Sequence, residues 1–284
     1  MSNPAKTVTP EWLANHLNDP TVKIIDASWY MPGAEMNAHE IYEEGHIPGA
    51  VQFDIDDIEL PNSGLPHMLA SEEDFAIAVG KLGIRETDTI VIYDGIGVFM
   101  AASRVWYNFV IMGAKDVRLL SGGMPAWNRL DLPVEEGRFT PEPVEFNASF
   151  DASRVKSIDD IRQAISDGGI QILDARARER FNGEVPESNP NLKIGHMPGA
   201  INVPYNPLMK LGEYKNEDDL RDIFEKAGVD LTKPIITTCG SGVTACVINF
   251  ALDMLGHQDH TMYDGSWTEW GGAENAEVVK GANG

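Results

Sequence analysis

The residue best suited to covalent chemistry in this sequence is a cysteine at the start of a glycine-rich turn. Cys239 follows the apolar run at 234–238, and the turn Cys-Gly-Ser-Gly-Val-Thr leads into an amphipathic segment. Backbone N–H groups of such a turn, together with the positive end of the helix dipole, stabilise an anion. A thiolate is such an anion, so this position favours a reactive cysteine. Cys246, on the apolar face of the following segment, is expected to be an inert core residue.

Four chemistries could use a thiolate in this turn, and the neighbouring residues help to separate them. A cysteine phosphatase needs an arginine six residues after the nucleophile to grip phosphate, but this chain has Ala245 there. Disulfide exchange needs a Cys-x-x-Cys pair, and Gly242 occupies the second place. Thioester or peptide hydrolysis stays open, although no local signature supports it. Sulfur transfer through a persulfide fits best, because the same amides can hold a terminal sulfur anion.

An internal repeat organises the elements that must position this turn. Four matches recur in the same order, about 145 residues apart. They pair IIDA at 24–27 with ILDA at 172–175, GHIPGA at 45–50 with GHMPGA at 195–200, TIVIYDGIGV from 89 with PIITTCGSGV from 234, and SGGMPAW at 121–127 with DGSWTEW at 264–270. The repeated Gly-His-x-Pro-Gly-Ala is expected to be a structural turn. The sequence predicts an N-terminal domain without the catalytic cysteine at 1–135, a linker at 136–151 and a C-terminal catalytic domain at 152–284.

Within each half, short β-branched runs alternate with amphipathic segments. The pattern predicts strands at 23–26, 89–93, 117–120, 171–174, 234–238 and 260–263, and helices at 72–82, 99–112, 158–167, 216–227 and 243–255. This alternation implies crossover connections and an α/β fold: two tandem domains, each with a mostly parallel sheet flanked by helices on both faces. Ligands bind such sheets at the carboxyl ends of the strands, where Cys239 lies. At the matching position the first half has Asp94.

Composition restricts the partners and the compartment. The 284 residues include 22 basic and 44 acidic side chains, a formal net charge of −22. Such a chain repels nucleic acid and anionic lipid, so we expect neither a nucleic-acid nor a membrane partner, and we expect a monomer. The longest apolar stretch, 98–114, is interrupted by Arg104 and Asn108. With two cysteines and no secretory or transit signal, the sequence predicts a reducing, cytoplasmic location.

The segment CGSGVTA at 239–245 resembles the active-site loop of the mercaptopyruvate sulfurtransferase group of the tandem-domain rhodanese family. Supporting segments are DARxxxRF at 174–181, GHMPGAINVP at 195–204, RVW at 104–106 and DGSWTEW at 264–270. The resemblance implies a pair of rhodanese-like domains, of which the C-terminal one is catalytic. It also implies that Cys239 takes sulfur from 3-mercaptopyruvate, carries it as a persulfide to a small thiol, cyanide or thioredoxin-like acceptor, and releases pyruvate.

The resemblance also assigns substrate-binding residues. Members of the family that prefer thiosulfate carry basic residues just after the cysteine, whereas this chain has Gly240 and Ser241, which favours 3-mercaptopyruvate. Thiosulfate transfer by the same cysteine is the alternative. Arg180 matches the arginine that grips the substrate carboxylate, a role suited to a planar cation with five donors. Asn189 stands where the group usually has a second arginine, and it can donate a hydrogen bond but adds no charge.

A second constellation comes from the first half of the chain. In FDIDDIELPNSGLPHML, Asp56 and His67 have the separation found in the mercaptopyruvate group, which implies a triad with Ser241. Asp56 would orient His67, His67 would take a proton from Ser241, and Ser241 would polarise the substrate carbonyl. The resemblance implies no cofactor, and the scattered histidines predict no metal site. The remaining expected contacts are the loop amides of Gly240, Gly242, Val243 and Thr244.

Overall fold

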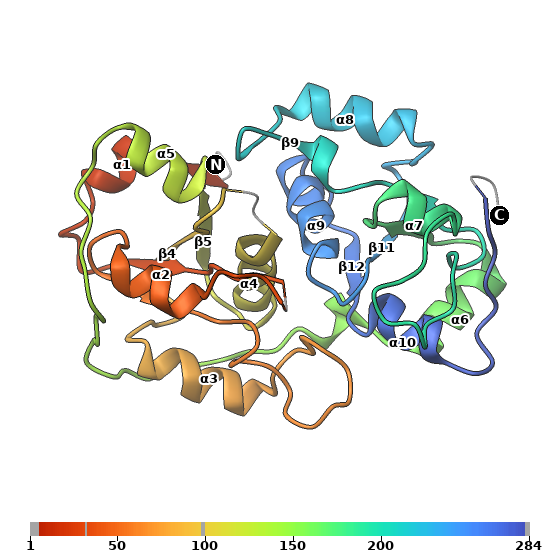
Figure 1. Cartoon of the computed structure of the whole chain (residues 1–284), viewed down its shortest axis with the longest axis horizontal. Coiled ribbons are helices and arrows are strands. Elements are labelled where there is room, and N and C mark those ends of the chain that lie inside the picture. Colours follow the sequence, from red (N-terminus) through yellow and green to blue (C-terminus); the bar gives the residue numbers. More distant parts are fainter. Residues whose placement is uncertain (1–5, 32, 98–99, 282–284) are drawn as a thin grey trace. The chain divides into compact units, whose positions relative to one another are not determined.

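The structure is a computed structural model of the chain, and it describes residues 6–31, 33–97 and 100–281. The described residues form two compact units (Figure 1). The first unit comprises residues from the ranges 1–60, 69–151 and 211–213, and the second comprises residues from 61–68, 152–210 and 214–284. The segments 61–68 and 211–213 therefore fold with the unit that is built mainly from the other half of the chain.

The first unit contains a five-stranded parallel sheet in the order β1-β5-β4-β2-β3. Its strands are β1 (Thr7–Val8), β2 (Val22–Asp26), β3 (Ala50–Gln52), β4 (Thr89–Tyr93) and β5 (Asp116–Leu120). Its helices are α1 (Pro10–Ala14), α2 (Ala38–Glu44), α3 (Glu72–Lys81), α4 (Met100–Ile111) and α5 (Gly123–Arg129). All four strand pairs are parallel, so the chain must return from the carboxyl end of one strand to the amino end of the next.

Side chains alternate between the two faces of the sheet along each strand, and helices pack on both faces. On one face, Val91 and Tyr93 of β4 pack in a buried cluster with Trp127 of α5. α4 packs against β4 and β5. Phe146, from the irregular segment that follows α5, is buried against Phe75 with ring centroids 5.6 Å apart. The segment 136–151 has no regular secondary structure, and it belongs to the first unit.

The second unit repeats this arrangement with a parallel sheet in the order β6-β12-β11-β7-β8. Its strands are β6 (Val155–Lys156), β7 (Gln171–Asp174), β8 (Ile201–Asn202), β11 (Ile235–Thr238) and β12 (His260–Tyr263). Its helices are α6 (Ile158–Asp167), α7 (Arg178–Asn182), α8 (Glu217–Lys226), α9 (Ala245–Met254), α10 (Ser266–Gly272) and the 3-10 turns η1 (Ala152–Arg154) and η2 (Asn206–Leu208). A separate two-stranded ribbon pairs β9 (Met209–Lys210) with β10 (Glu213–Tyr214).

The predicted fold class is confirmed: each half is an α/β unit with a parallel sheet flanked by helices. The predicted strands and helices each correspond to an observed element within two residues at either end. The first residue of the helix predicted at 99–112 lies outside the described residues, and α4 is described from Met100. Among the helices that the structure describes, none is long and apolar enough to cross a bilayer.

The repeated Gly-His-x-Pro-Gly-Ala is a structural turn in both units, as predicted. His46 and His196 are both buried, and their rings stack on Tyr42 and Phe181 with centroids 4.0 and 3.7 Å apart. Each Nδ1 lies 2.8 Å from the backbone carbonyl oxygen of the residue on whose ring it stacks. The two histidines therefore fix how the turn packs on the preceding helix.

Candidate active site

The cysteine turn lies at the carboxyl end of β11, as predicted. Cys239 directly follows the strand and is 2% exposed, and α9 begins six residues later at Ala245. Gly242 has a φ of +78°, in the left-handed region that residues with a Cβ adopt only with strain. The glycine therefore lets the chain turn sharply between the strand and the helix.

The turn is anchored through its carbonyl groups. The Trp267 N–H donates to the carbonyl of Cys239 at 3.0 Å, and the Thr268 N–H and hydroxyl donate to the carbonyl of Gly240 at 2.9 and 2.8 Å. The Cys239 N–H donates to the Ser266 hydroxyl at 3.2 Å. Because α10 holds these carbonyls, it fixes the path of the turn beside the cysteine sulfur.

The backbone N–H groups that follow Cys239 in the turn form few hydrogen bonds. Over the part of the chain that the structure describes, the N–H groups of Gly240, Ser241, Val243 and Thr244 donate no hydrogen bond. None of these four residues is more than partly exposed, and Val243 is buried. A cluster of unpaired backbone donors beside a sulfur atom is suited to hold an anion.

The first unit provides an internal comparison for this geometry. Asp94 occupies the position equivalent to Cys239, is buried, and accepts the N–H of Gly97 on Oδ1 at 2.5 Å. The carbonyl of Asp94 accepts the Met124 N–H at 3.1 Å, as the carbonyl of Cys239 accepts that of Trp267. The equivalent turn thus donates to a side-chain oxygen, although here a carboxyl group replaces the thiol.

Arg180 on α7 lies next to the cysteine turn. A Cβ built on Gly240 would stand 3.6 Å from Arg180 Nη2, so the guanidinium faces this glycine directly. The Arg180 side chain is 36% exposed, and both Nε and Nη2 donate to Oε2 of Glu187, from Nε at 3.0 Å. Arg180 therefore presents a fixed but accessible positive charge beside the turn.

Glu187 joins Arg180 to a second, fully buried arginine. Arg176 Nη1 donates to Glu187 Oε1 at 2.9 Å, and Nη2 donates to Asp174 Oδ2 at 2.6 Å. The Arg176 guanidinium also stacks 4.1 Å above the Trp267 ring. Burial disfavours the charge, but the carboxylates of Asp174 and Glu187 outweigh it and raise the pKa of Arg176. Asp174 and Arg176 thus form a buried ion pair at the end of β7.

Glu187 is the functional candidate that the sequence did not single out. The run Pro-Glu-Ser-Asn at 186–189 is polar, yet Glu187 is 5% exposed. The available signal was the run of three arginines within the preceding eleven residues, of which Arg176 and Arg180 contact Glu187, because a buried carboxylate requires cationic partners.

The predicted triad residues are placed as follows. The Ser241 hydroxyl forms no hydrogen bond with any described residue. His67 is 9% exposed, has a φ of +57° and belongs to the segment 61–68, in the same compact unit as Ser241. Asp56 belongs to the first unit, where its Oδ2 accepts a hydrogen bond from Trp29 Nε1 at 2.8 Å. The relay from Ser241 through His67 to Asp56 stays a prediction.

Of the remaining residues that the sequence analysis named, Asn189 lies at the surface and Cys246 in the core. Asn189 is exposed, and its Oδ1 accepts the N–H of Asn191 at 3.0 Å, which closes a local turn. Cys246 is fully buried in α9, as predicted, and its thiol donates to the Gly242 carbonyl at 3.3 Å. The second cysteine therefore packs beneath the turn and supports it.

One group of side chains in the first unit has the composition of a cation site. His39, Asp54 and Asp57 each offer a ligand atom, and these atoms lie within 4.8 Å of one another. His39 Nε2 is 3.5 Å from Asp54 Oδ2, and burial raises the pKa of Asp54. These residues are not part of the cysteine turn.

Comparison with known proteins agrees with this geometry. The family description "Rhodanese-like domain" matches residues 9–130 and 157–273. The 3-mercaptopyruvate sulfurtransferase of Escherichia coli K12 is 43% identical over 95% of this chain and 96% of its own length. The thiosulfate sulfurtransferase of Rattus norvegicus is 39% identical over 93% of this chain and 91% of its own. The crystal structure of SseA from Escherichia coli, described as a 3-mercaptopyruvate sulfotransferase, matches with a TM-score of 0.86 and 43% identity over 93% and 99% of the two chains.

The fold and the site define a protein with two rhodanese-like domains in tandem, of which the second has the cysteine. The chain belongs to the rhodanese family.

Proposed function

We propose that this chain is a sulfurtransferase that takes sulfur from 3-mercaptopyruvate, carries it on Cys239 as a persulfide and releases pyruvate. The observation that carries the proposal is the set of unpaired N–H groups at Gly240, Ser241, Val243 and Thr244, which follow the cysteine directly. The likeness to the Escherichia coli enzyme over almost the full length of both chains supports the choice of donor. The catalytic domain is proposed to be residues 152–284.

In the first half-reaction, the Cys239 thiolate attacks the sulfur of 3-mercaptopyruvate. The new S–S bond forms as the C–S bond breaks, and the electron pair of that bond leaves on the enolate of pyruvate. A proton then adds to the enolate carbon and gives pyruvate. Ser241, with His67 and Asp56 behind it, is proposed to donate to the carbonyl oxygen while it carries the enolate charge.

In the second half-reaction, an acceptor thiolate or cyanide attacks the outer sulfur of the Cys239 persulfide. The S–S bond breaks, and the Cys239 thiolate returns as the leaving group. The loop amides of Gly240, Gly242, Val243 and Thr244 are proposed to hold the terminal sulfur between the two steps. Such alternation gives ping-pong kinetics, the signature of a covalent carrier.

The donor carboxylate is proposed to bind Arg180, whose guanidinium lies beside Gly240. Asn189 is proposed to add a hydrogen bond without charge. Thiosulfate is the second candidate donor, favoured by the 39% identity to the rat thiosulfate sulfurtransferase. Because thiosulfate is a dianion and this turn carries no basic residue after the cysteine, 3-mercaptopyruvate is the better match.

The proposal is tested by intact-protein mass measurement after mixing with 3-mercaptopyruvate and removing the excess. The wild-type chain is expected to gain one sulfur atom, and Cys239→Ser is expected to gain none. Cys246→Ser is the matched control and should still gain the sulfur. No gain on the wild-type chain, or an equal gain on Cys239→Ser, would refute the proposal. Turnover on 3-mercaptopyruvate and on thiosulfate then separates the two donors.

The acceptor, location and assembly follow from the same chemistry. A small thiol, cyanide or a thioredoxin-like protein is proposed as acceptor, because each offers a nucleophile for the outer sulfur. A cytoplasmic location is proposed, since Cys239 must remain a free thiol and a reducing compartment keeps it so. A monomer without nucleic-acid or membrane partners is proposed from the net charge of −22.

A further inference from the structure

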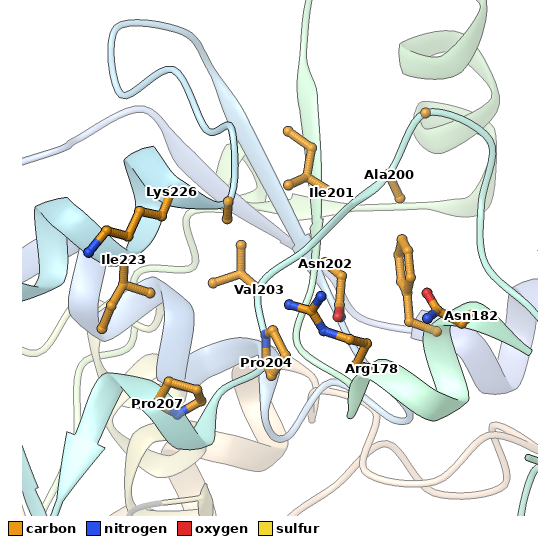
Figure 2. Close-up of a pocket in the computed structure, with 13 residues that line it drawn as sticks. Arg178, Asn182, Ala200, Ile201, Asn202, Val203, Pro204, Pro207, Ile223 and Lys226 are labelled. Carbon is orange, nitrogen blue, oxygen red and sulfur yellow. The ribbon is translucent and has the colours of Figure 1, made fainter. Parts of the chain in front are cut away.

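The second unit has a groove that is separate from the cysteine turn. Its cavity of about 600 Å³ is lined by residues of α7, β8, the segment after β8 and α8. Figure 2 shows Ile223 and Lys226 of α8 on one side of Val203, and Arg178 and Asn182 of α7 on the other. None of the lining residues belongs to the cysteine turn at 239–244.

The first unit has the equivalent groove, as matched contacts establish. Tyr42 and Phe181 stack on the repeated histidines, so His39 and Arg178, three residues before them, are equivalent. α3 and α8 each end in a lysine, Lys81 and Lys226. In the first unit, α2, β3 and the end of α3 line a cavity of about 270 Å³.

The chain itself occupies this groove in the first unit. The cavity that remains there is lined partly by residues 138–141, which continue from the pairing of Glu135 with His46. The Gly137 N–H donates to the Glu43 carbonyl at 2.8 Å, and the Val144 N–H donates to the Gly80 carbonyl at 2.9 Å. Phe139 and Pro141 thus line the groove, in an irregular segment held by hydrogen bonds at both ends.

In the second unit the described chain follows the same path only as far as the entrance. Val279 pairs with His196 as Glu135 pairs with His46, and the Gly281 N–H donates to the Asn182 carbonyl at 3.0 Å. These contacts match those of Glu135 and Gly137 one for one. No described residue then crosses the second groove in the way that 138–144 crosses the first.

The uncovered groove offers apolar, cationic and polar contacts together. Phe181 and Ile223 supply apolar surface. Arg178 and Lys226 supply positive charge, and Lys226 also pairs with Asp222 one turn earlier on α8, at 2.5 Å. Arg178 is exposed and makes no ion pair or side-chain hydrogen bond with a described residue. Asn202 donates to the carbonyls of Asp174 and Arg176, but its Oδ1 is buried and has no donor among the described residues.

The charge of the groove is unusual for this chain. The described lining residues include two cations and no carboxylate, although the chain has 44 acidic side chains and 22 basic ones. A second copy of the chain is an unsuitable occupant, because its own segment 138–144 already lies in its first groove. Positive charge and apolar surface together match an extended peptide with carboxylates and a ring to bury.

We propose that the groove between α7 and α8 docks an extended, acidic, proline-containing segment of a partner protein. The segment lies as Phe139 and Pro141 lie in the first unit, and its carboxylates pair with Arg178 and Lys226. Prolines favour this binding because they hold the free peptide extended and so lower the entropy lost on docking.

The test uses the full chain and a fluorescein-labelled peptide with the sequence Phe-Thr-Pro-Glu-Pro-Val-Glu-Phe, which is that of residues 139–146. Fluorescence anisotropy is expected to give a dissociation constant of about 10 to 100 μM that weakens as salt is raised. The double variant R178E/K226E is expected to weaken binding at least about tenfold, because two attractions become repulsions. A scrambled peptide of the same composition is expected to bind more weakly.

The matched control is Lys81→Glu, at the equivalent position of the first unit, whose groove is already covered. It should leave peptide binding unchanged, and sulfur loading of Cys239 should be unchanged in R178E/K226E, so the groove and the catalytic site are tested separately. The proposal is overturned if the peptide fails to bind at about 1 mM. It is equally overturned if R178E/K226E binds as the wild type does, or if the scrambled peptide binds equally well.

Discussion

Backbone donors of the turn and two linked guanidinium groups lie near the proposed reactive sulfur: Arg180 faces Gly240, and Arg176 interacts electrostatically with Cys239. The guanidinium of Arg180 is held by Glu187, whose other oxygen accepts a hydrogen bond from the buried Arg176. Glu187 is therefore a positioning residue, because it contacts Arg180 and fixes where the positive charge lies. Its removal should affect donor binding more than the chemical step.

Glu187→Gln tests this role, because glutamine keeps the shape and removes the charge. The KM for 3-mercaptopyruvate is expected to rise about tenfold with a smaller change in kcat, since Arg180 loses its ionic partner. Stability is expected to fall by about 1–3 kcal/mol, because the buried Arg176 loses one of its two carboxylates. Steady-state kinetics and urea denaturation measure the two effects.

Glu184→Gln is the matched control, because Glu184 is exposed and accepts a hydrogen bond only from Asn182 within the described chain. Glu187→Asp should recover part of the lost affinity, since it restores the charge. An unchanged KM in Glu187→Gln would mean that Arg180 is positioned without the buried carboxylate.

The turn itself depends on the left-handed conformation of Gly242. Gly242→Ala is expected to cost about 1 kcal/mol of stability and to lower kcat/KM at least about tenfold, because the strained backbone moves the amides beside the sulfur. Gly256→Ala is the control, since Gly256 has a φ of +73° and open space around it. Equal kinetic losses in both variants would show that the turn geometry is not specifically required.

The role of a residue was predictable where its spacing in the sequence defines its chemistry, and unpredictable where its burial does. Cys239 was recognised because a strand and a glycine turn flank it, and Arg180 because it falls within a motif. Glu187 was not, because its importance comes from two arginines that the fold brings onto it. The nearby arginines were a signal, but only the fold determines which neighbouring carboxylate is buried against them.

At the scale of elements, the central strands and long helices were predictable and the edges were not. β4 and β11 are continuous buried runs, and α6 has an apolar stripe, so their periodicity is clear. β1, β3, β6 and β8 have only two or three residues each, too few to display a period. Their pairing is set by the neighbouring strand, and short helices such as α7 are likewise stabilised by packing.

The buried His196 in the repeated turn makes the stability of the folded chain depend on pH. Burial lowers the pKa of His196 below its ordinary value of 6.5, so the folded chain keeps the ring neutral. As the pH falls below 6.5, the unfolded chain binds this proton first, and the free energy of unfolding therefore decreases. The slope from this group is at most about 1.4 kcal/mol per pH unit.

Urea denaturation at several pH values between about 7.5 and 5.5 measures this effect. His196→Gln is expected to be less stable at the upper pH but to lose less stability on acidification. His257→Gln is the control, because His257 is a half-exposed histidine outside the turn. A pH dependence of His196→Gln as steep as that of the wild type would contradict the assignment.

At the scale of the whole molecule, the two units share one fold but differ at equivalent positions. The turn after β4 holds the carboxylate of Asp94, and the turn after β11 follows a thiol. The groove beside α2 is filled by the chain, and the groove beside α7 is left uncovered by the described residues. The repeat was visible in the sequence, but the path of 138–144 was not, because an irregular segment has no period from which its contacts could be inferred.

The net charge of −22 leads to a prediction about the entire chain. Repulsion among 44 acidic side chains opposes folding, whereas exposed ion pairs such as Arg162–Asp159 contribute at most about 1 kcal/mol each. Salt screens both the repulsion and the attraction, so the stronger of the two decides whether stability rises or falls. The thermal midpoint is expected to rise by several degrees between about 0.02 and 0.3 M NaCl, because the acidic excess makes repulsion the stronger. Differential scanning calorimetry measures this shift. NaCl is the suitable salt, because sulfate also stabilises proteins by being excluded from their surface, which would hide the effect of screening. A midpoint that falls with NaCl would mean that attractive pairs outweigh the repulsion despite the acidic excess.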